Sequence, residues 1–162
     1  MKDSLRINVG DIITIDERRF RIIHISPEWI ILCQMDIEKL VLINRDFSAF
    51  KKDIEDGIVS LTKDEDSRIV DYDALTDIQR KHFDGRKGFV TAVSNAYGPT
   101  YMKLAEQNTS KEEFKDAYLK NGISKSRAWI IIRKYLQSGL KEYSLLRKQT
   151  SAKKEICRSA SA

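Results

Sequence analysis

The chain has 162 residues, of which 33% are charged and 41% hydrophobic, a composition that excludes a disordered chain and fits one domain or two small ones. It contains no long apolar stretch, which excludes a membrane span and a signal peptide. Residues 1–66 carry 10 basic and 14 acidic residues, a net charge of −4, whereas residues 67–162 carry 19 and 10, a net charge of +9. This asymmetry predicts two parts with different roles, the second suited to a polyanion.

The first part, residues 1–66, is predicted to be rich in β-structure. Short apolar runs between polar turns predict strands at residues 12–15, 20–25, 29–35, 40–43 and 58–61, with a hairpin turn at 16–18. Phe47, Phe50 and Ile54 recur at helical spacing, which predicts one short helix that is capped by Asn44 and ended by Gly57. Strands this short predict a bent sheet or a small SH3-like β-barrel, whose closure would protect the strand edges.

The two cysteines indicate the compartment. Cys33 lies in a strand-like run and Cys157 near the end of the chain, so they do not form a disulfide framework. The sequence therefore predicts a cytoplasmic protein.

The polar segment 63–68 marks a predicted domain boundary, beyond which the patterns are helical. Residues 67–146 are predicted to form an all-α domain with helices at residues 73–83, 87–97, 100–107 and 111–120, and one more after residue 124. In the first helix Leu75, Ile78 and His82 are expected to face inward, and Ser110 with Glu113 fits a capping box for the fourth. Residues 147–162 are predicted to be a basic, flexible tail. The fold class is thus α+β.

Residues 111–139 have the pattern of a helix-turn-helix. Gly122 can adopt the positive φ that ends the first helix, and Ser124 is placed to cap the second. The second helix is predicted to end at Gly139. Its predicted buried face consists of Ala128, Ile131, Ile132 and Tyr135.

The outward face of this second helix is basic, as a DNA recognition helix requires. Base-edge contacts are predicted for Lys125, Ser126 and Arg127, and Ile130 is a candidate contact to a thymine methyl group. Backbone contacts are predicted for Lys120, Ser124, Trp129, Arg133 and Lys134. Two alternatives stay open: Trp129 belongs to the core, or the whole helix is an ordinary surface helix with a charged face.

Three stretches carry a resemblance to a known family: residues 6–23, with two apolar strands around a polar turn, residues 46–61, and residues 120–139. In the third, the family pattern is matched by Ile123, Ser124, Lys125, Ser126, Arg127, Trp129, Ile131, Ile132, Arg133, Lys134 and Tyr135. This order resembles the N-terminal region of the TnsB-type transposase, the DDE-family subunit of heteromeric bacterial transposons. The resemblance implies sequence-specific binding to double-stranded DNA at transposon ends, other transposition proteins as partners, and a place at the bacterial nucleoid.

The resemblance does not imply catalysis by this chain. The family's ribonuclease-H-like part, in which three acidic residues hold two metal ions, is expected downstream of the matched region. No catalytic, metal or cofactor residue is therefore carried over, and the chain is expected not to be an enzyme. A protein-interaction adaptor and a small helix-turn-helix transcriptional regulator remain the alternative functions.

The remaining polar clusters predict no catalytic or metal site. Asp64, Glu65 and Asp66 are adjacent acids in a polar linker, which are usually solvated rather than metal ligands. The two histidines, His24 and His82, are far apart in sequence, and residues 85–88 lack the strand that precedes a phosphate-binding loop.

Overall fold

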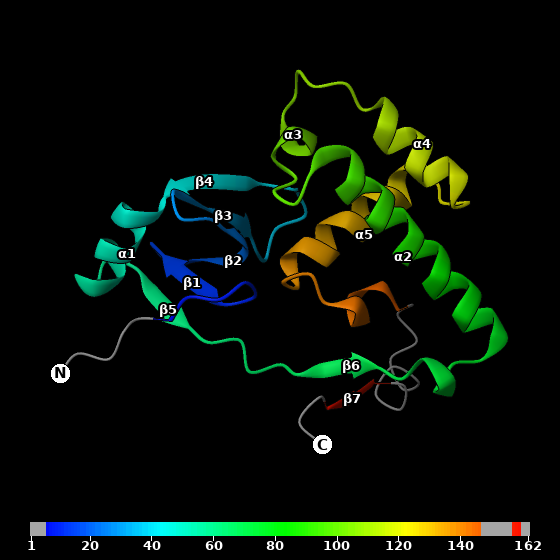
Figure 1. Ribbon diagram of the computed structural model, residues 1–162, viewed down its shortest axis with the longest axis horizontal. Helices are drawn as coiled ribbons and strands as arrows, with labels where there is room; N and C mark the ends of the chain where they lie inside the picture. Colours follow the sequence, from blue (N-terminus) through cyan, green and yellow to red (C-terminus); the bar gives the residue numbers. More distant parts are fainter. Residues whose placement is uncertain (1–5, 147–156, 160–162) are drawn as a thin grey trace. The chain divides into compact units, whose positions relative to one another are not determined.

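The computed structural model describes residues 6–146 and the backbone of residues 157–159, and the chain divides into two compact units, Met1–Asp64 and Glu65–Ala162 (Figure 1). The first unit contains a five-stranded antiparallel sheet, and the second consists mainly of helices. The predicted α+β class is confirmed. No helix within the described ranges is long and apolar enough to cross a membrane.

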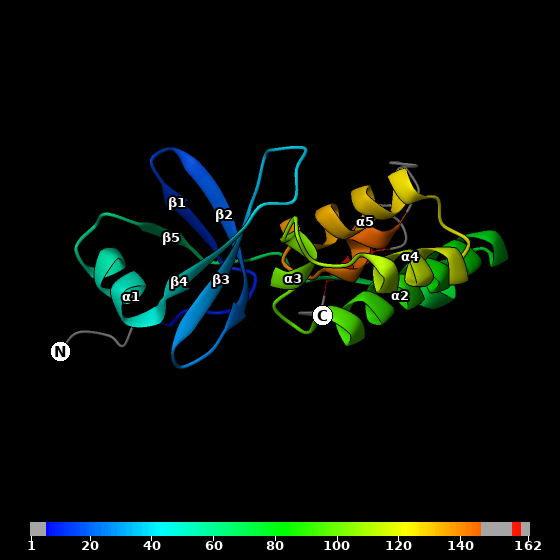
Figure 2. The ribbon, with the colours of Figure 1, turned by 90° about the horizontal axis from the view of Figure 1, so that it is seen from above.

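The sheet of the first unit is open rather than closed into a barrel. It is built from β1 (Ile12–Ile15), β2 (Arg18–Ile25), β3 (Trp29–Gln34), β4 (Leu42–Asp46) and β5 (Ser60–Thr62). The strand order is β4-β3-β2-β1-β5, so β4 and β5 are the two edges (Figure 2). Helix α1 (Phe47–Glu55) follows β4 directly and packs on β3 and β4, after which the chain pairs β5 with β1. The predicted closure is therefore wrong.

Local turn chemistry sets the register of this sheet. Asp16 and Glu17 form a two-residue hairpin loop with φ values of 49° and 67°, the backbone of a type I′ turn, which matches the twist of β1 and β2. The predicted cap Asn44 is wrong, because β4 extends to Asp46 along its ladder with β3. Asp46 caps α1 instead, with its Oδ1 accepting a hydrogen bond of 2.9 Å from the Ala49 amide.

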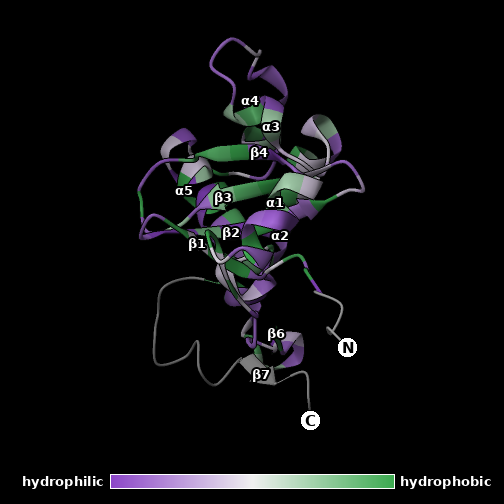
Figure 3. Cartoon of the chain, turned by 90° about the vertical axis from the view of Figure 1, so that its left-hand side faces the viewer, coloured by the Kyte–Doolittle hydropathy of each residue, from purple (hydrophilic) through white to green (hydrophobic). Residues whose placement is uncertain are grey.

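One face of the sheet and α1 enclose the core of the first unit. Figure 3 shows the apolar character of β3 within it. The core consists of Ile13, Phe20, Ile22, Ile30, Leu32, Phe50 and Val59. Cys33 is also buried and is not in a disulfide, whereas the side chain of Cys157 lies outside the described residues.

A buried carboxylate joins the start and the end of the sheet. Asp11 is 2% exposed and accepts hydrogen bonds from the backbone amides of Asn8 (2.9 Å) and Asp64 (3.0 Å) and from Lys63 Nζ (2.6 Å). Burial by itself raises the pKa of Asp11, but the bonds from Lys63 and the two amides outweigh it, so the net pKa is lowered. The ionised form is therefore favoured in the folded state.

We expect Asp11→Ala to lower the free energy of unfolding of the first unit by about 2–4 kcal/mol, since two backbone amides and Lys63 lose their shared, buried carboxylate acceptor. In the wild type this contribution should be complete above pH 3.8, the ordinary pKa, and should be lost as the pH falls through the lower folded-state pKa. Urea denaturation of both proteins between pH 2 and pH 7 measures this. A difference in unfolding free energy between the wild type and Asp11→Ala that stays constant across this pH range would contradict the prediction.

The second unit contains one long helix where two were predicted. Its elements are β6 (Arg68–Val70), η1 (Tyr72–Ala74), α2 (Asp77–Tyr97), α3 (Met102–Ala105), α4 (Glu112–Lys120), α5 (Lys125–Gln137), η2 (Glu142–Leu145) and β7 (Cys157–Ser159). Helix α2 begins with a capping box of Thr76 and Gln79, and Ile78 is 70% exposed, so the predicted start of this helix and the inward orientation of Ile78 are wrong.

Gly88 of α2 allows a close approach of the α4–α5 turn. A Cβ atom at Gly88 would lie 2.7 Å from Asn121 Oδ1, and one at Gly85 would lie 3.6 Å from the Asn121 carbonyl oxygen. The turn between α4 and α5 thus lies against α2 at Gly88, where a Cβ atom would come too close to the Asn121 side chain, whereas Gly85 leaves room for one. The sequence wrongly predicted two helices in place of α2, because the contact between Gly88 and Asn121 joins residues that are distant in sequence.

The ends of the second unit also differ from expectation. β6 pairs with β7, so residues 157–159 of the predicted flexible tail form a strand; the remainder of that tail lies outside the described residues. Asp66, expected to be solvated, accepts hydrogen bonds from Arg68 at 2.8 and 3.0 Å, and Arg68 lies over the Tyr143 ring. These contacts attach β6 to η2.

Candidate nucleic-acid interface

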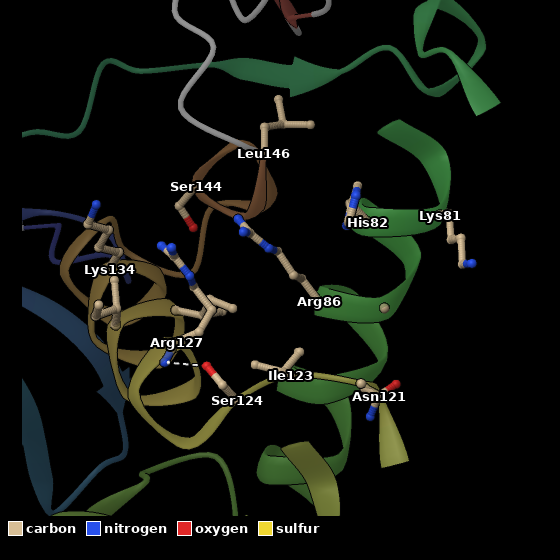
Figure 4. A pocket seen from close by; sticks show the side chains of 14 residues that line it. Lys81, His82, Arg86, Asn121, Ile123, Ser124, Arg127, Lys134, Ser144 and Leu146 are labelled. Carbon is tan, nitrogen blue, oxygen red and sulfur yellow. Dashed lines mark hydrogen bonds between the residues drawn. The ribbon is translucent and has the colours of Figure 1, made fainter. Parts of the chain in front are cut away.

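Helices α4 and α5 form a helix-turn-helix with both predicted end signals. Gly122 has φ 67°, and the amides of Gly122 and Ile123 donate to the carbonyl oxygens of Leu119 (3.1 Å) and Tyr118 (2.9 Å), which is a Schellman motif. Ser124 caps α5, with its Oγ accepting from the Arg127 amide at 3.3 Å (dashed in Figure 4). The predictions for Gly122 and Ser124 are confirmed.

The opposite end of α4 is capped by a distant side chain. The predicted Ser110–Glu113 capping box is not formed, because α4 begins at Glu112 after Lys111, which makes no side-chain cap. The Tyr97 hydroxyl, at the end of α2, accepts a hydrogen bond from the Phe114 amide (3.1 Å) and donates to the Ser110 carbonyl oxygen (3.2 Å). Burial raises the pKa of Tyr97, which keeps the phenol protonated for this role.

The buried face of α5 attaches it to the rest of the unit. Ala128, Ile131, Ile132 and Leu136 are buried, whereas Tyr135, predicted for this face, is half-buried and Leu136 takes the central place. Burial, with smaller effects of Tyr101 and Glu142, raises the pKa of Tyr135 to about 12. The phenol is therefore neutral near pH 7 and adds no charge to α5.

The predicted contact residues occupy three sides of α5. Lys125, Ser126 and Arg127 are exposed in its first turn, and Ile130, Arg133 and Lys134 are half-buried. The ring of Trp129 packs on Phe114 at 4.2 Å between centroids, but the residue is half-buried, so it contacts the core without being enclosed by it. Lys120 is exposed at the end of α4.

A groove of about 960 Å³ runs along one flank of α5, between α2, the α4–α5 turn, α5 and η2 (Figure 4). We call it the α2–α5 groove. It is lined by Lys81, His82, Gly85, Arg86, Asn121, Gly122, Ile123, Ser124, Arg127, Ile130, Ile131, Lys134, Ser144 and Leu146. It brings together four of the predicted contact residues, Ser124, Arg127, Ile130 and Lys134, and leaves out the other five.

The charged side chains that line the groove are all basic. Its lining includes Lys81, Arg86, Arg127 and Lys134, and no acidic residue is among the described residues that line it. Arg86 and Arg127 extend into the space from opposite sides, and Arg86 Nη1 donates to the Leu145 carbonyl oxygen at 3.1 Å. A cleft lined by charges of one sign concentrates the positive potential at this place.

Sequence reasoning missed the contribution of α2 to this groove. Arg86 falls in the predicted break between two helices, which gives it no fixed position relative to His82. Had the helical period been continued through Gly85, His82 and Arg86 would have fallen one turn apart on one face.

Neither a metal-binding cluster in the described part of the chain nor a match to a known family points to another kind of site. No group of three or more His, Cys, Asp or Glu side chains that could hold a metal ion occurs in residues 6–146. No model of a known protein family matches the chain, and a search of curated proteins finds no match either.

Proposed function

We propose that this chain binds double-stranded DNA through the helix-turn-helix of its second unit. The observation that carries the proposal is the composition and placement of α5. Residues 125–137 contain Lys125, Arg127, Arg133 and Lys134 and no acidic residue, while the opposite face of the same helix is buried. A capped helix with a basic N-terminal turn, held rigidly by its apolar face, can enter the major groove.

The placement of the side chains suggests separate roles. Lys125 and Ser126 are exposed in the first turn of α5, and we assign base contacts to them and to Ile130, which lies one turn after Ser126 and is half-buried at the groove. Arg127 and Lys134 lie on the flank that lines the α2–α5 groove, so we assign them to phosphates. This assignment moves Arg127 from base reading, as predicted from sequence, to backbone binding.

By its resemblance to TnsB-type transposases, we propose transposon-end DNA as the target. In this proposal the chain positions DNA without cleaving it, and other transposition proteins are its partners. A transcriptional regulator would use the same surface, and the two are distinguished by which genomic fragments the full chain retains.

We expect the full chain to bind random duplex DNA with an affinity that falls steeply with salt. Four cations on α5 predict a slope of log K against log salt of about −3 or steeper. Fluorescence anisotropy with a labelled random duplex between 50 and 300 mM NaCl measures this slope. A protein-interaction adaptor would show no saturable binding, and that result would refute the proposal.

A further inference from the structure

We infer that the α2–α5 groove is a phosphodiester site, in which Arg86 of α2 and Arg127 of α5 together hold the backbone of the DNA strand that passes beside α5. This inference rests on the proposed function and extends it, because it adds a helix outside the helix-turn-helix to the DNA contact. The added contact residue is Arg86 of α2, which the sequence pattern did not identify as a DNA-binding residue.

The geometry favours an anion at this place. Two guanidinium groups enter the groove from opposite helices, and Asn121, Ser124 and Ser144 add polar side chains to its lining. Within the described residues, Arg127 makes no ion pair with a carboxylate. Like charges that face one another repel, and a bound phosphate between them would relieve that repulsion. Arginine donates in a fork that fits phosphate oxygens.

The length of the cationic surface favours a strand over a small free anion. Arg127 and Lys134 are seven residues apart on α5, which places them about 10 Å apart along the helix axis. One inorganic phosphate cannot contact both ends of that row, whereas consecutive phosphates of one strand can.

The test compares two neighbouring positions of α2 in the full chain. Arg86→Gln removes the charge from the groove, and Lys87→Gln removes the same charge from the next residue, which does not line the groove and pairs with Glu142 at 3.3 Å. Arg86→Gln should flatten the salt slope for random duplex DNA by about one unit and weaken binding roughly fivefold at 0.15 M salt. Lys87→Gln should leave both nearly unchanged.

Three further measurements separate a phosphodiester contact of Arg86 from a structural role and from a free-anion site. Arg86→Lys keeps the positive charge and should restore most of the salt slope. A methylphosphonate linkage removes the charge of a single phosphate. In a series of duplexes with one such linkage each, the linkage at one position should lower the DNA affinity of the wild type and leave that of Arg86→Gln unchanged. Thermal melting in inorganic phosphate and in chloride at equal ionic strength tests for a free-anion site.

Each outcome decides the inference. Equal slopes for Arg86→Gln and Lys87→Gln, with normal binding by the wild type, would overturn the groove assignment and leave the proposed function standing. Stabilisation by inorganic phosphate that depends on Arg86, without an effect of Arg86→Gln on DNA, would assign the groove to a free anion and also overturn it. Absence of any salt-dependent DNA binding by the wild type would overturn both proposals.

Discussion

Ser126→Glu should abolish DNA binding while it slightly stabilises the fold. Ser126 is exposed at the second position of α5, where a carboxylate interacts favourably with the helix dipole, by about 0.3–1 kcal/mol. In the proposed complex the same carboxylate would enter the major groove at the base edges, between the phosphate rows of the two strands, and juxtaposed like charges cost several kcal/mol. We therefore expect at least about a hundredfold loss of affinity for cognate and random duplexes alike. Anisotropy titrations and urea denaturation measure the two effects.

The matched control is Ile78→Glu. Ile78 occupies the second position of α2, is 70% exposed, and lies outside the groove and the surface of α5. This variant adds the same charge at the same kind of helix position and should keep most of the DNA affinity. If both variants weaken binding equally, the effect comes from net charge, and α5 does not form the interface.

Phe114→Ala should lower the free energy of unfolding of the second unit by about 3–5 kcal/mol. Phe114 is 1% exposed, and its ring contacts those of Phe89, Tyr118 and Trp129 at 5.5, 5.7 and 4.2 Å between centroids. Removing the ring leaves a cavity between α2, α4 and α5, and α5 loses the aromatic surface on which Trp129 packs. DNA affinity should therefore fall as well.

Urea denaturation followed by circular dichroism at 222 nm reports mainly on this helical unit. Leu119→Ala is the control on the same helix, because Leu119 is 59% exposed and its truncation should change stability by no more than about 0.5 kcal/mol. Similar losses for Phe114→Ala and Leu119→Ala would show that the aromatic cluster does not hold the helix-turn-helix together.

Local signals predicted much of the first unit and the helix-turn-helix. The first three strands, the Asp16–Glu17 turn, the Gly122 turn and the Ser124 cap follow from interactions between residues a few positions apart. Such interactions are present in the sequence pattern itself, because a turn or a cap needs only its own residues. The α+β class follows from the same periodicities.

Other features depended on parts of the chain that are distant in sequence. At the start of α4 the buried Tyr97 hydroxyl of α2 accepts from the Phe114 amide, in addition to the local bond from the Glu112 amide to Ser110 Oγ. The sheet stays open because its two edge strands, β4 and β5, do not pair with each other. Neither the Tyr97 contact nor the open sheet could be predicted from the spacing of residues along the sequence.

The sequence by itself determined that a basic helix with one apolar face follows a glycine turn, because helical periodicity and end signals act within one or two turns. Only the tertiary structure decided what that helix lies beside. The sequence predicted a break between residues 83 and 87, but α2 runs through this segment, and its Gly88 is the point at which Asn121 of the turn comes close. That continuous helix brings Arg86 opposite Arg127 and creates the groove, since side-chain position across a gap depends on packing rather than on local conformational preference.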